Sequence, residues 1–243
     1  MAERNSQPWA TGPAEILKHG LDLLGKESDT NRRLAIISID NSVELMIKTY
    51  ISLPKRINGL SISRREISDA SESFPKLLDA LETHAEQKLD GIDLGEIEWY
   101  HRLRNELYHQ GNGLTVERDK VEVYSELAKL LFKNLFGIDL LPSEPSGDDL
   151  LGKFMATWAR FERRLHSFIS RREGIDVRPM PSIHSMRQLV QAGVLTREEM
   201  GEFDQIRRIR NEVVHGVVEH HSVLNTDLIS RLEALVSKIP GDG

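Results

Sequence analysis

Cysteine is absent from the 243-residue chain, which excludes disulfides, thiolate catalysis and cysteine-based zinc sites. The sequence has no apolar run of the ~18 residues expected of a membrane span. Its first residues, MAERNSQPWATG, lack the basic-then-apolar pattern of a secretory signal. It also contains no glycine-rich phosphate loop and no HExxH zinc pattern. We therefore expect a cytoplasmic protein with no membrane segment, no cofactor and no metal.

Positive charge is in short supply, and it is unevenly distributed. The net charge is −6; residues 150–243 contain 14 Lys and Arg against 12 Asp and Glu, whereas residues 1–149 contain 18 against 26. Broad, non-specific binding to nucleic acid by counterion release is therefore not expected. A local site lined by arginines stays open, because the field in a cleft depends on nearby charges rather than on the total.

Apolar residues recur at helical spacing along almost the whole chain, which indicates an all-α protein. The stretch AIISI (35–39) is β-branched, but the helical spacing continues past it to Ile51. The segment 55–73 is polar and is predicted to be a loop. The predicted helices cover residues 13–27, 31–53, 74–86, 96–110, 115–137, 150–174, 182–193, 196–217 and 224–239.

The segment IDLLPSEPSGDD (138–149), with two prolines, a glycine and two serines, is the predicted domain boundary. On each side of it the pattern reads long helix, short helix, motif helix and final helix. This order predicts an internal duplication of a small helical bundle, with bundles at 10–140 and 148–240.

A polar motif occurs in both halves, as RLRNELYH (102–109) and RIRNEVVH (208–215). Five of the eight positions are identical, and all five are charged or polar, whereas the differing positions are apolar. Core packing tolerates such apolar exchanges. The two copies therefore hold the polar spacing in common, which favours a function for the polar residues.

On an ideal helix the motif residues three, four and seven positions apart share one face. In the first copy this face carries Arg102, Asn105 and His109, and Trp99, Leu103 and Leu107 are assigned to the core. The second copy is expected to present Arg208, Asn211 and His215 in the same way. Arg104 and Arg210 lie about 140° from their histidines, so they join the site only through their length or if the helix ends near the histidine. Gly111 and Gly216 favour a helix end there.

Histidine exchanges a proton near neutral pH, and the planar guanidinium of arginine suits phosphate oxygens. Two such motifs face to face would supply two imidazoles and several guanidiniums. RNA cleavage needs one base for the 2′-hydroxyl, one acid for the leaving 5′-oxygen, and cations for the charge that develops on phosphorus. The expected products are a 2′,3′-cyclic phosphate and a 5′-hydroxyl, with no metal required.

The arginine–asparagine pair with Arg-x4-His spacing resembles the HEPN superfamily (higher eukaryotes and prokaryotes nucleotide-binding). The first half is similar to that family also in IDNSVELMIKTYI (39–51), whose nearest counterpart in the second half is FERRLHSFI (161–169). The resemblance implies two tandem HEPN-like helical bundles forming a pseudo-two-fold intrachain pair. It also implies a metal-independent endoribonuclease of toxin or antiphage-defence type that acts on tRNA or mRNA. A partner such as an antitoxin or defence protein would be typical, and a homodimer would be the alternative to the intrachain pair. The implied catalytic residues are Arg104, Asn105, His109, Arg210, Asn211 and His215, and Arg102, Arg207 and Arg208 are expected to bind RNA.

Two other functions stay open. One is a non-catalytic HEPN module that binds RNA, a nucleotide or a partner protein. The other is a metal-dependent hydrolase that uses His215 with His220 and His221.

Several further residues have a structural interpretation beside the functional one. Glu106 and Glu212 are expected to pair with nearby arginines, and Glu44 and Glu162 either brace a motif arginine or lie on a solvated face. The three tryptophans are assigned to packing. The remaining histidines, at positions 19, 84, 101, 166 and 184, are expected at the surface.

Overall fold

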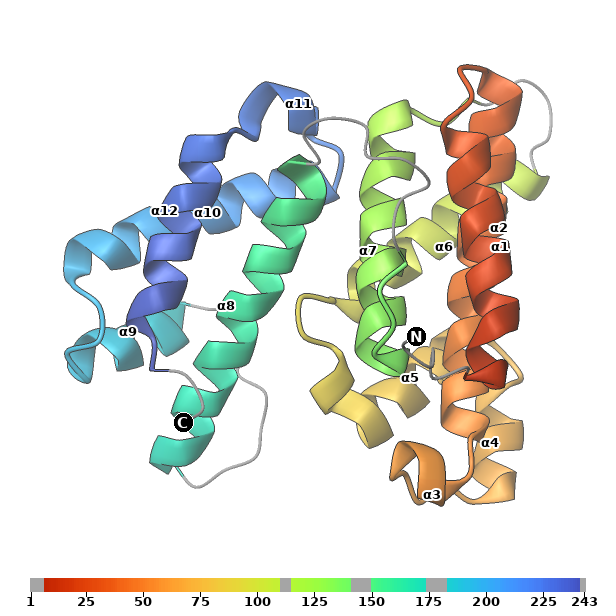
Figure 1. The fold of residues 1–243 in the computed structure, drawn as a ribbon, viewed down its shortest axis with the longest axis horizontal. Helices are drawn as coiled ribbons and strands as arrows, with labels where there is room; N and C mark the ends of the chain where they lie inside the picture. The colour runs from red at the N-terminus through yellow and green to blue at the C-terminus, as the bar shows by residue number, and fades with distance from the viewer. Residues whose placement is uncertain (1–6, 110–114, 141–149, 174–182, 241–243) are drawn as a thin grey trace, which may run out of the picture. The chain divides into compact units, whose positions relative to one another are not determined.

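A computed structural model of the protein describes residues 7–109, 115–140, 150–173 and 183–240, except for the side chains of Tyr108, His109, Glu173 and Ile183. Every regular element within these ranges is a helix, which confirms the all-α prediction. None of the described helices is long and apolar enough to cross a membrane. The chain forms two compact units, Met1–Glu144 and Pro145–Gly243, whose helices are labelled in Figure 1.

The first unit is built around α2, which contacts α1, α5, α6 and α7. Its residues Ile36, Ile39, Val43, Met46 and Ile47 are fully buried at helical spacing, so the β-branched AIISI stretch is helical as predicted. Burial of this apolar face against four neighbours is what stabilises a helix of ordinary propensity. The helices are α1 (Pro8–Leu24), α2 (Asp29–Ser52), α3 (Lys55–Asn58), α4 (Arg64–Ala70), α5 (Phe74–Ala85), α6 (Leu94–His109) and α7 (Arg118–Phe136), with a 3₁₀ turn at Glu86–Lys88.

Figure 1 shows α1 and α2 side by side along most of their length. Gly20 lies where α1 approaches α2, and a Cβ atom at this position would lie 2.8 Å from Cγ1 of Ile39 and 3.2 Å from its backbone nitrogen. Because backbone atoms cannot move aside as a flexible side chain does, the close packing of these two helices requires glycine here.

The second unit pairs α8 with α12, and α10 contacts both α9 and α12. Its core is rich in aromatic rings: Phe161 and Phe203 stack with centroids 4.7 Å apart, and Trp158 stacks on Phe203 at 5.6 Å. The helices are α8 (Leu150–Glu173), α9 (Ile183–Gln191), α10 (Arg197–Val214), α11 (His220–Val223) and α12 (Thr226–Lys238). The order long, short, motif and final helix is present, with α11 as an added turn.

The prediction of a loop over 55–73 was wrong, because α3 and α4 lie within it. Gly59 ends α3 with φ +78°, and Ser63 begins α4 with a capping box in which its side chain and Glu66 exchange hydrogen bonds with each other's backbone. The Ser-x-x-Glu signal was present, but seven residues of mixed polarity show little apolar periodicity. The capping box predicted at Thr196 and Glu199 is confirmed.

The last helix, α12, should be essential to the second unit because Leu228, Leu232 and Leu235 bury its apolar face. Leu232 is fully buried, so we expect Leu232→Ala to lower the free energy of unfolding by about 2–5 kcal/mol. The matched control is Ser230→Ala on the exposed face of the same helix, which should change it by less than about 0.5 kcal/mol. Urea unfolding followed by circular dichroism measures both, and equal effects would contradict the assigned burial.

Candidate functional site

The first motif lies on the last turns of α6, and the buried face of that helix differs from the one expected. Ile97, Tyr100 and Leu107 are buried at three- and seven-residue intervals, whereas Trp99 and Leu103 are only half-buried. The assignment of Trp99, Leu103 and Leu107 to the core was therefore right for Leu107 alone. Arg104 lies on the same face as the buried residues, with its side chain 17% exposed.

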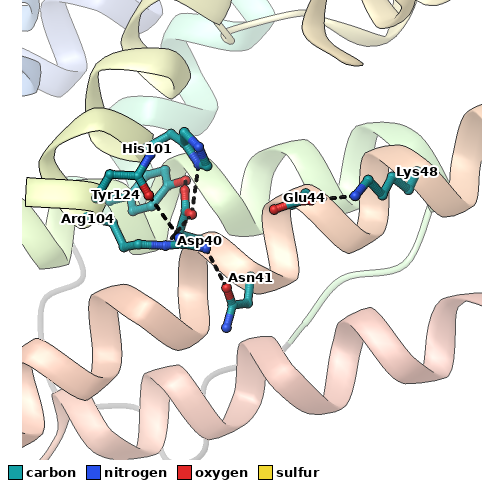
Figure 2. Close-up of polar contacts among 8 residues, drawn as sticks. Asp40, Asn41, Glu44, Lys48, His101, Arg104 and Tyr124 are labelled. Carbon is teal, nitrogen blue, oxygen red and sulfur yellow. Dashed lines mark hydrogen bonds and ion pairs between the residues drawn. The ribbon is translucent and has the colours of Figure 1, made fainter. Parts of the chain in front are cut away.

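Three groups of the protein surround the guanidinium of Arg104, and two of them, Asp40 and Asn41, are labelled in Figure 2. Its Nε lies 2.9 Å from Oδ2 of Asp40, in an electrostatic contact rather than a well-directed hydrogen bond. Its Nη2 donates to Oδ1 of Asn41 at 2.7 Å, and its Nη1 donates to Oδ1 of Asn105 at 2.9 Å. Arg104 is thus fastened to α2 and to its own neighbour in the motif.

Asp40 is fully buried on α2 and receives polar groups from two other helices. The hydroxyl of Tyr124, on α7, donates to Oδ1 at 2.7 Å, and Nδ1 of His101, on α6, lies 3.0 Å from Oδ2. The ring of Phe74, on α5, stacks on His101 with centroids 3.9 Å apart. A carboxylate removed from water costs several kcal/mol unless such partners surround it. The Asp40 cluster (Asp40, His101, Arg104 and Tyr124) therefore joins α2, α6 and α7.

The expectation that His101 lies at the surface was wrong, because its side chain is 14% exposed and is held between Asp40 and Phe74. Of the two alternatives for Glu44, the bracing of a motif arginine is not observed: Glu44 is part-exposed and pairs with Lys48 on its own helix, and the acid beside Arg104 is Asp40, one turn earlier (Figure 2). The sequence held a signal for Asp40, because it occupies a position on the apolar face of α2, between Ile36 and Val43.

The other first-motif residues divide between the interior and the surface. Asn105 is half-buried, and because its Oδ1 accepts from Arg104, its amide nitrogen is the atom that can donate to an imidazole or a phosphate. Arg102 is exposed and lies 3.9 Å from Glu98. His109 is the last residue of α6, and its side chain lies outside the described residues, as does Gly111.

The second motif, on α10, repeats the register of the first. Phe203, Ile206, Arg210 and Val213 are buried, and each lies 106 positions after its counterpart in the stripe of α6. Arg210 is only 5% exposed. In both units the motif arginine therefore occupies the same place in the inward face of its helix.

The surroundings of Arg210 are aromatic rather than purely ionic. Its Cζ lies 5.8 Å from the centroid of the Trp158 ring, within the range of a cation–π contact. The indole Nε1 of Trp158 donates to Oε1 of Glu162 at 2.7 Å, and both residues are buried on α8. Glu162 therefore does not lie on a solvated face, and Trp158 is a packing residue as expected.

The helix of the second motif ends at its histidine. His215 is the C-cap of α10 and is exposed, and Gly216 follows with φ +63°. The N–H of Val217 donates to the carbonyl of Glu212 and that of Gly216 to the carbonyl of Val213, which is a Schellman motif. The helix end predicted from Gly216 is confirmed, and it places His215 at the rim of the unit with Asn211 one turn before it.

Arg207 and Arg208 precede the second motif and share one carboxylate. Nη2 of Arg207 lies 2.7 Å from Oδ1 of Asp204, and Nη2 of Arg208 lies 2.8 Å from its Oδ2. The hydrogen bond from Arg207, together with the charge of Arg208, lowers the pKa of Asp204 below its usual value. Arg208 is 72% exposed, so its charge is directed to solvent.

A cavity of about 440 Å³ lies in the first unit away from the motif, and sequence reasoning missed it. Trp9, Tyr50 and Phe136 supply aromatic walls, and Lys88 supplies a cation. Desolvation raises the pKa of Tyr50 above its usual value, so this hydroxyl stays neutral. The size is within the range of small-molecule pockets.

Comparisons of the chain with protein-family models, with curated proteins and with solved structures gave no match. The functional interpretation therefore depends on the residues and their geometry.

Breaking the Asp40 cluster should cost far more than breaking the neighbouring surface pair. Asp40→Asn removes the fully buried charge of the pair and leaves the part-buried guanidinium of Arg104 without its counter-ion, so we expect a loss of about 3–5 kcal/mol in the free energy of unfolding. Glu44→Gln, on the same helix one turn later, removes a part-exposed pair with Lys48 and should cost less than about 1 kcal/mol. Urea titration of both variants measures the difference, and similar small losses would show that Asp40 does not hold α6 in place.

Tyr124 should make the first unit sensitive to alkali. Burial, followed by the charge of Asp40, raises the pKa of Tyr124 well above its usual value. In the unfolded chain the tyrosine ionises near pH 10, so its contribution is complete below about pH 10 and is lost as the pH rises towards the folded pKa.

The stability advantage of the wild type over Tyr124→Phe should therefore be constant from pH 8 to about 9.5 and then fall by up to about 1.4 kcal/mol per pH unit. Equilibrium urea unfolding at each pH gives this difference, in which Tyr50 cancels because both chains carry it. A difference that stays constant up to pH 11 would contradict the assignment.

Proposed function

We propose that the chain is a metal-independent endoribonuclease of tandem HEPN type, with one composite site formed by its two Arg-x4-His motifs. The observation that carries this proposal is the repeated register. In each unit an arginine on the inward face of the motif helix, part-buried in the first unit and buried in the second, lies one position before an asparagine and five before a histidine at the helix end. A purely structural arginine needs neither the asparagine nor the histidine to recur at these positions.

The geometry separates the roles of the motif residues. Arg104 is a positioning residue, because its donors are directed to Asp40, Asn41 and Asn105. By holding Oδ1 of Asn105, it directs the amide nitrogen of that residue away from itself. Asn105 and Asn211 then orient an imidazole or a phosphate oxygen. The exposed Arg102 and Arg208 and the part-buried Arg207 attract the phosphates.

The chemistry assigned to the histidines is a transesterification. One of His109 and His215 accepts the proton of a ribose 2′-hydroxyl as its oxygen attacks phosphorus. The other donates a proton to the 5′-oxygen as the P–O5′ bond breaks. The products are a 2′,3′-cyclic phosphate and a 5′-hydroxyl, and the arginines balance the charge of the phosphorane. A role as a toxin or in antiphage defence, acting on tRNA or mRNA, accords with this activity.

A second candidate function is nucleotide binding without catalysis. The cavity with Trp9, Tyr50 and Lys88 favours it, because aromatic walls and one cation suit a base and a phosphate. This candidate predicts an intact fold and no RNA cleavage.

Cleavage of total tRNA and mRNA should persist in EDTA and leave cyclic-phosphate ends. His109→Ala and His215→Ala should each reduce the rate by about 100- to 10,000-fold, with the double variant little worse than either, since the two act as a unit. Each should change the free energy of unfolding by less than about 1 kcal/mol. His184→Ala, an exposed histidine on α9, is the matched control and should leave the rate unchanged.

The outcomes separate the hypotheses. A requirement for a divalent metal would contradict the proposed mechanism. It would favour the metal-dependent hydrolase that uses His215 with His220 and His221. No cleavage by the wild type would favour the binding module. Recovery of activity on mixing the two single variants would place the composite site between two chains instead of within one.

A further inference from the structure

A slot of about 160 Å³ opens beside the second motif, in a part of α10 of which the catalytic proposal uses only Arg207, for the attraction of phosphates. Met186 on α9 forms one wall of the slot. The other walls come from α10 and consist of Met200, Gly201, Phe203, Asp204 and Arg207. The base of the slot is apolar, and its polar groups are the ion pair between Asp204 and Arg207. It is therefore a different kind of site from the polar motif two turns later.

Gly201 lines the slot and is exposed. It lies in the interior of α10, where glycine destabilises a helix relative to alanine. A Cβ atom built on it meets nothing within 4 Å, so neither packing nor a positive φ requires glycine here. Because Gly201 lines the slot, the absence of a side chain leaves the slot open at this position.

The size and chemistry of the slot suit one six-membered ring. A cavity of about 150 Å³ accommodates benzene. Methionine sulfur and the phenylalanine ring make favourable contacts with aromatic rings and adapt to their shape. At the rim, the Asp204 carboxylate can accept from a base amino group, and Arg207 can donate to a base carbonyl.

The position of the slot connects it to the motif. One face of α10 carries polar residues at three- and four-residue spacing from the slot to the end of the motif. They are Asp204, Arg207 or Arg208, Asn211 and His215. From Arg207 to His215 the helix rises by about 12 Å. A nucleotide held in the slot would therefore place a nearby phosphodiester of the same strand beside His215.

We infer that the slot binds a single unpaired pyrimidine base of the RNA, and that it sets the base preference of the protein near the cut. This inference rests on the proposed ribonuclease function, because it takes RNA as the ligand. The apolar floor contacts the ring, and the Asp204–Arg207 pair reads the edge of the base. A purine, with two fused rings, exceeds the space.

The test measures binding to RNA that cannot be cut. Pentamers of 2′-O-methyl RNA lack the attacking hydroxyl, so binding is read whether or not the protein cleaves. Three versions carry, at the central position, a pyrimidine, a purine or no base, with purines elsewhere. The wild type should bind the pyrimidine pentamer about tenfold more tightly than the other two, a base-stacking contribution of ordinary size.

Filling the slot should abolish this preference without unfolding the protein. Gly201→Leu should bind all three pentamers with the weaker affinity, and its melting temperature should stay at or above that of the wild type because leucine favours helix. Gly201→Ala, which adds one methyl group, should keep the preference. So should Gln205→Leu, which places the same leucine side chain at an exposed position outside the slot.

Equal affinities of the wild type for the three pentamers would overturn the inference and leave the slot to an apolar side chain of a protein partner. A purine preference, or a preference that survives in Gly201→Leu, would also overturn it. Cleavage of ordinary RNA is measured separately. A preference for the pyrimidine pentamer without cleavage of ordinary RNA would refute the proposed ribonuclease function and support base binding in the slot. Cleavage without a preference would support the ribonuclease function and refute base binding in the slot.

Discussion

The buried carboxylate of Asp40 is the constraint on which the arrangement of the first unit depends. A lone carboxylate in an apolar core would cost several kcal/mol, so the surrounding helices must bring donors to it. The hydroxyl of Tyr124 and the side chains of His101 and Arg104 meet this need from α7 and α6. Because each donor approaches in a specific direction, the cluster determines how α6 is rotated, which an apolar contact alone specifies less sharply. The rotation of α6 in turn sets where Asn105 points.

The second unit buries its motif arginine with different partners. Arg210 lies over the ring of Trp158, and that indole donates to the buried Glu162. Glu162 follows Phe161 on the long helix as Asp40 follows Ile39, so acid and arginine recur at matching places in the two units. The aromatic ring supplies apolar packing and a negative face to the guanidinium. Two units with little sequence in common therefore hold the same residue type in the same register by different means.

Burial of these arginines changes what the motif is expected to do. An arginine whose donors are directed to protein groups stabilises and orients, whereas an exposed arginine is available to a phosphate. On this view Arg104 holds Asn105, and the proposed cations for RNA are the exposed Arg102 and Arg208, with the part-buried Arg207 beside them. The slot beside Gly201 adds an apolar contact to the same face of α10. Phosphate attraction and base recognition are then proposed for neighbouring residues of α10, and Arg207 takes part in both.

Apolar periodicity was sufficient to predict the long helices, because a buried face repeats every three or four residues whatever the helix packs against. Local hydrogen bonding also predicted the capping box at Thr196 and the helix end at Gly216, since both form within a few residues. The repeated Arg-Asn-x3-His spacing, and with it the candidate site, was visible without any structure.

Tertiary packing decided which face of each motif helix turns inward. The sequence of α6 offers two apolar stripes, one through Leu103 and one through Tyr100, and both include Leu107. The cluster around Asp40 selects the stripe that contains Arg104. The side chain of His101 is largely enclosed because it contacts Asp40 and Phe74. No local sequence pattern predicts this, since both partners lie far away in the chain. The slot likewise needs Met186 from another helix. A sequence determines which residues share a helix face, whereas the neighbours that arrive on folding determine whether that face is buried, because burial is a property of contacts between distant segments.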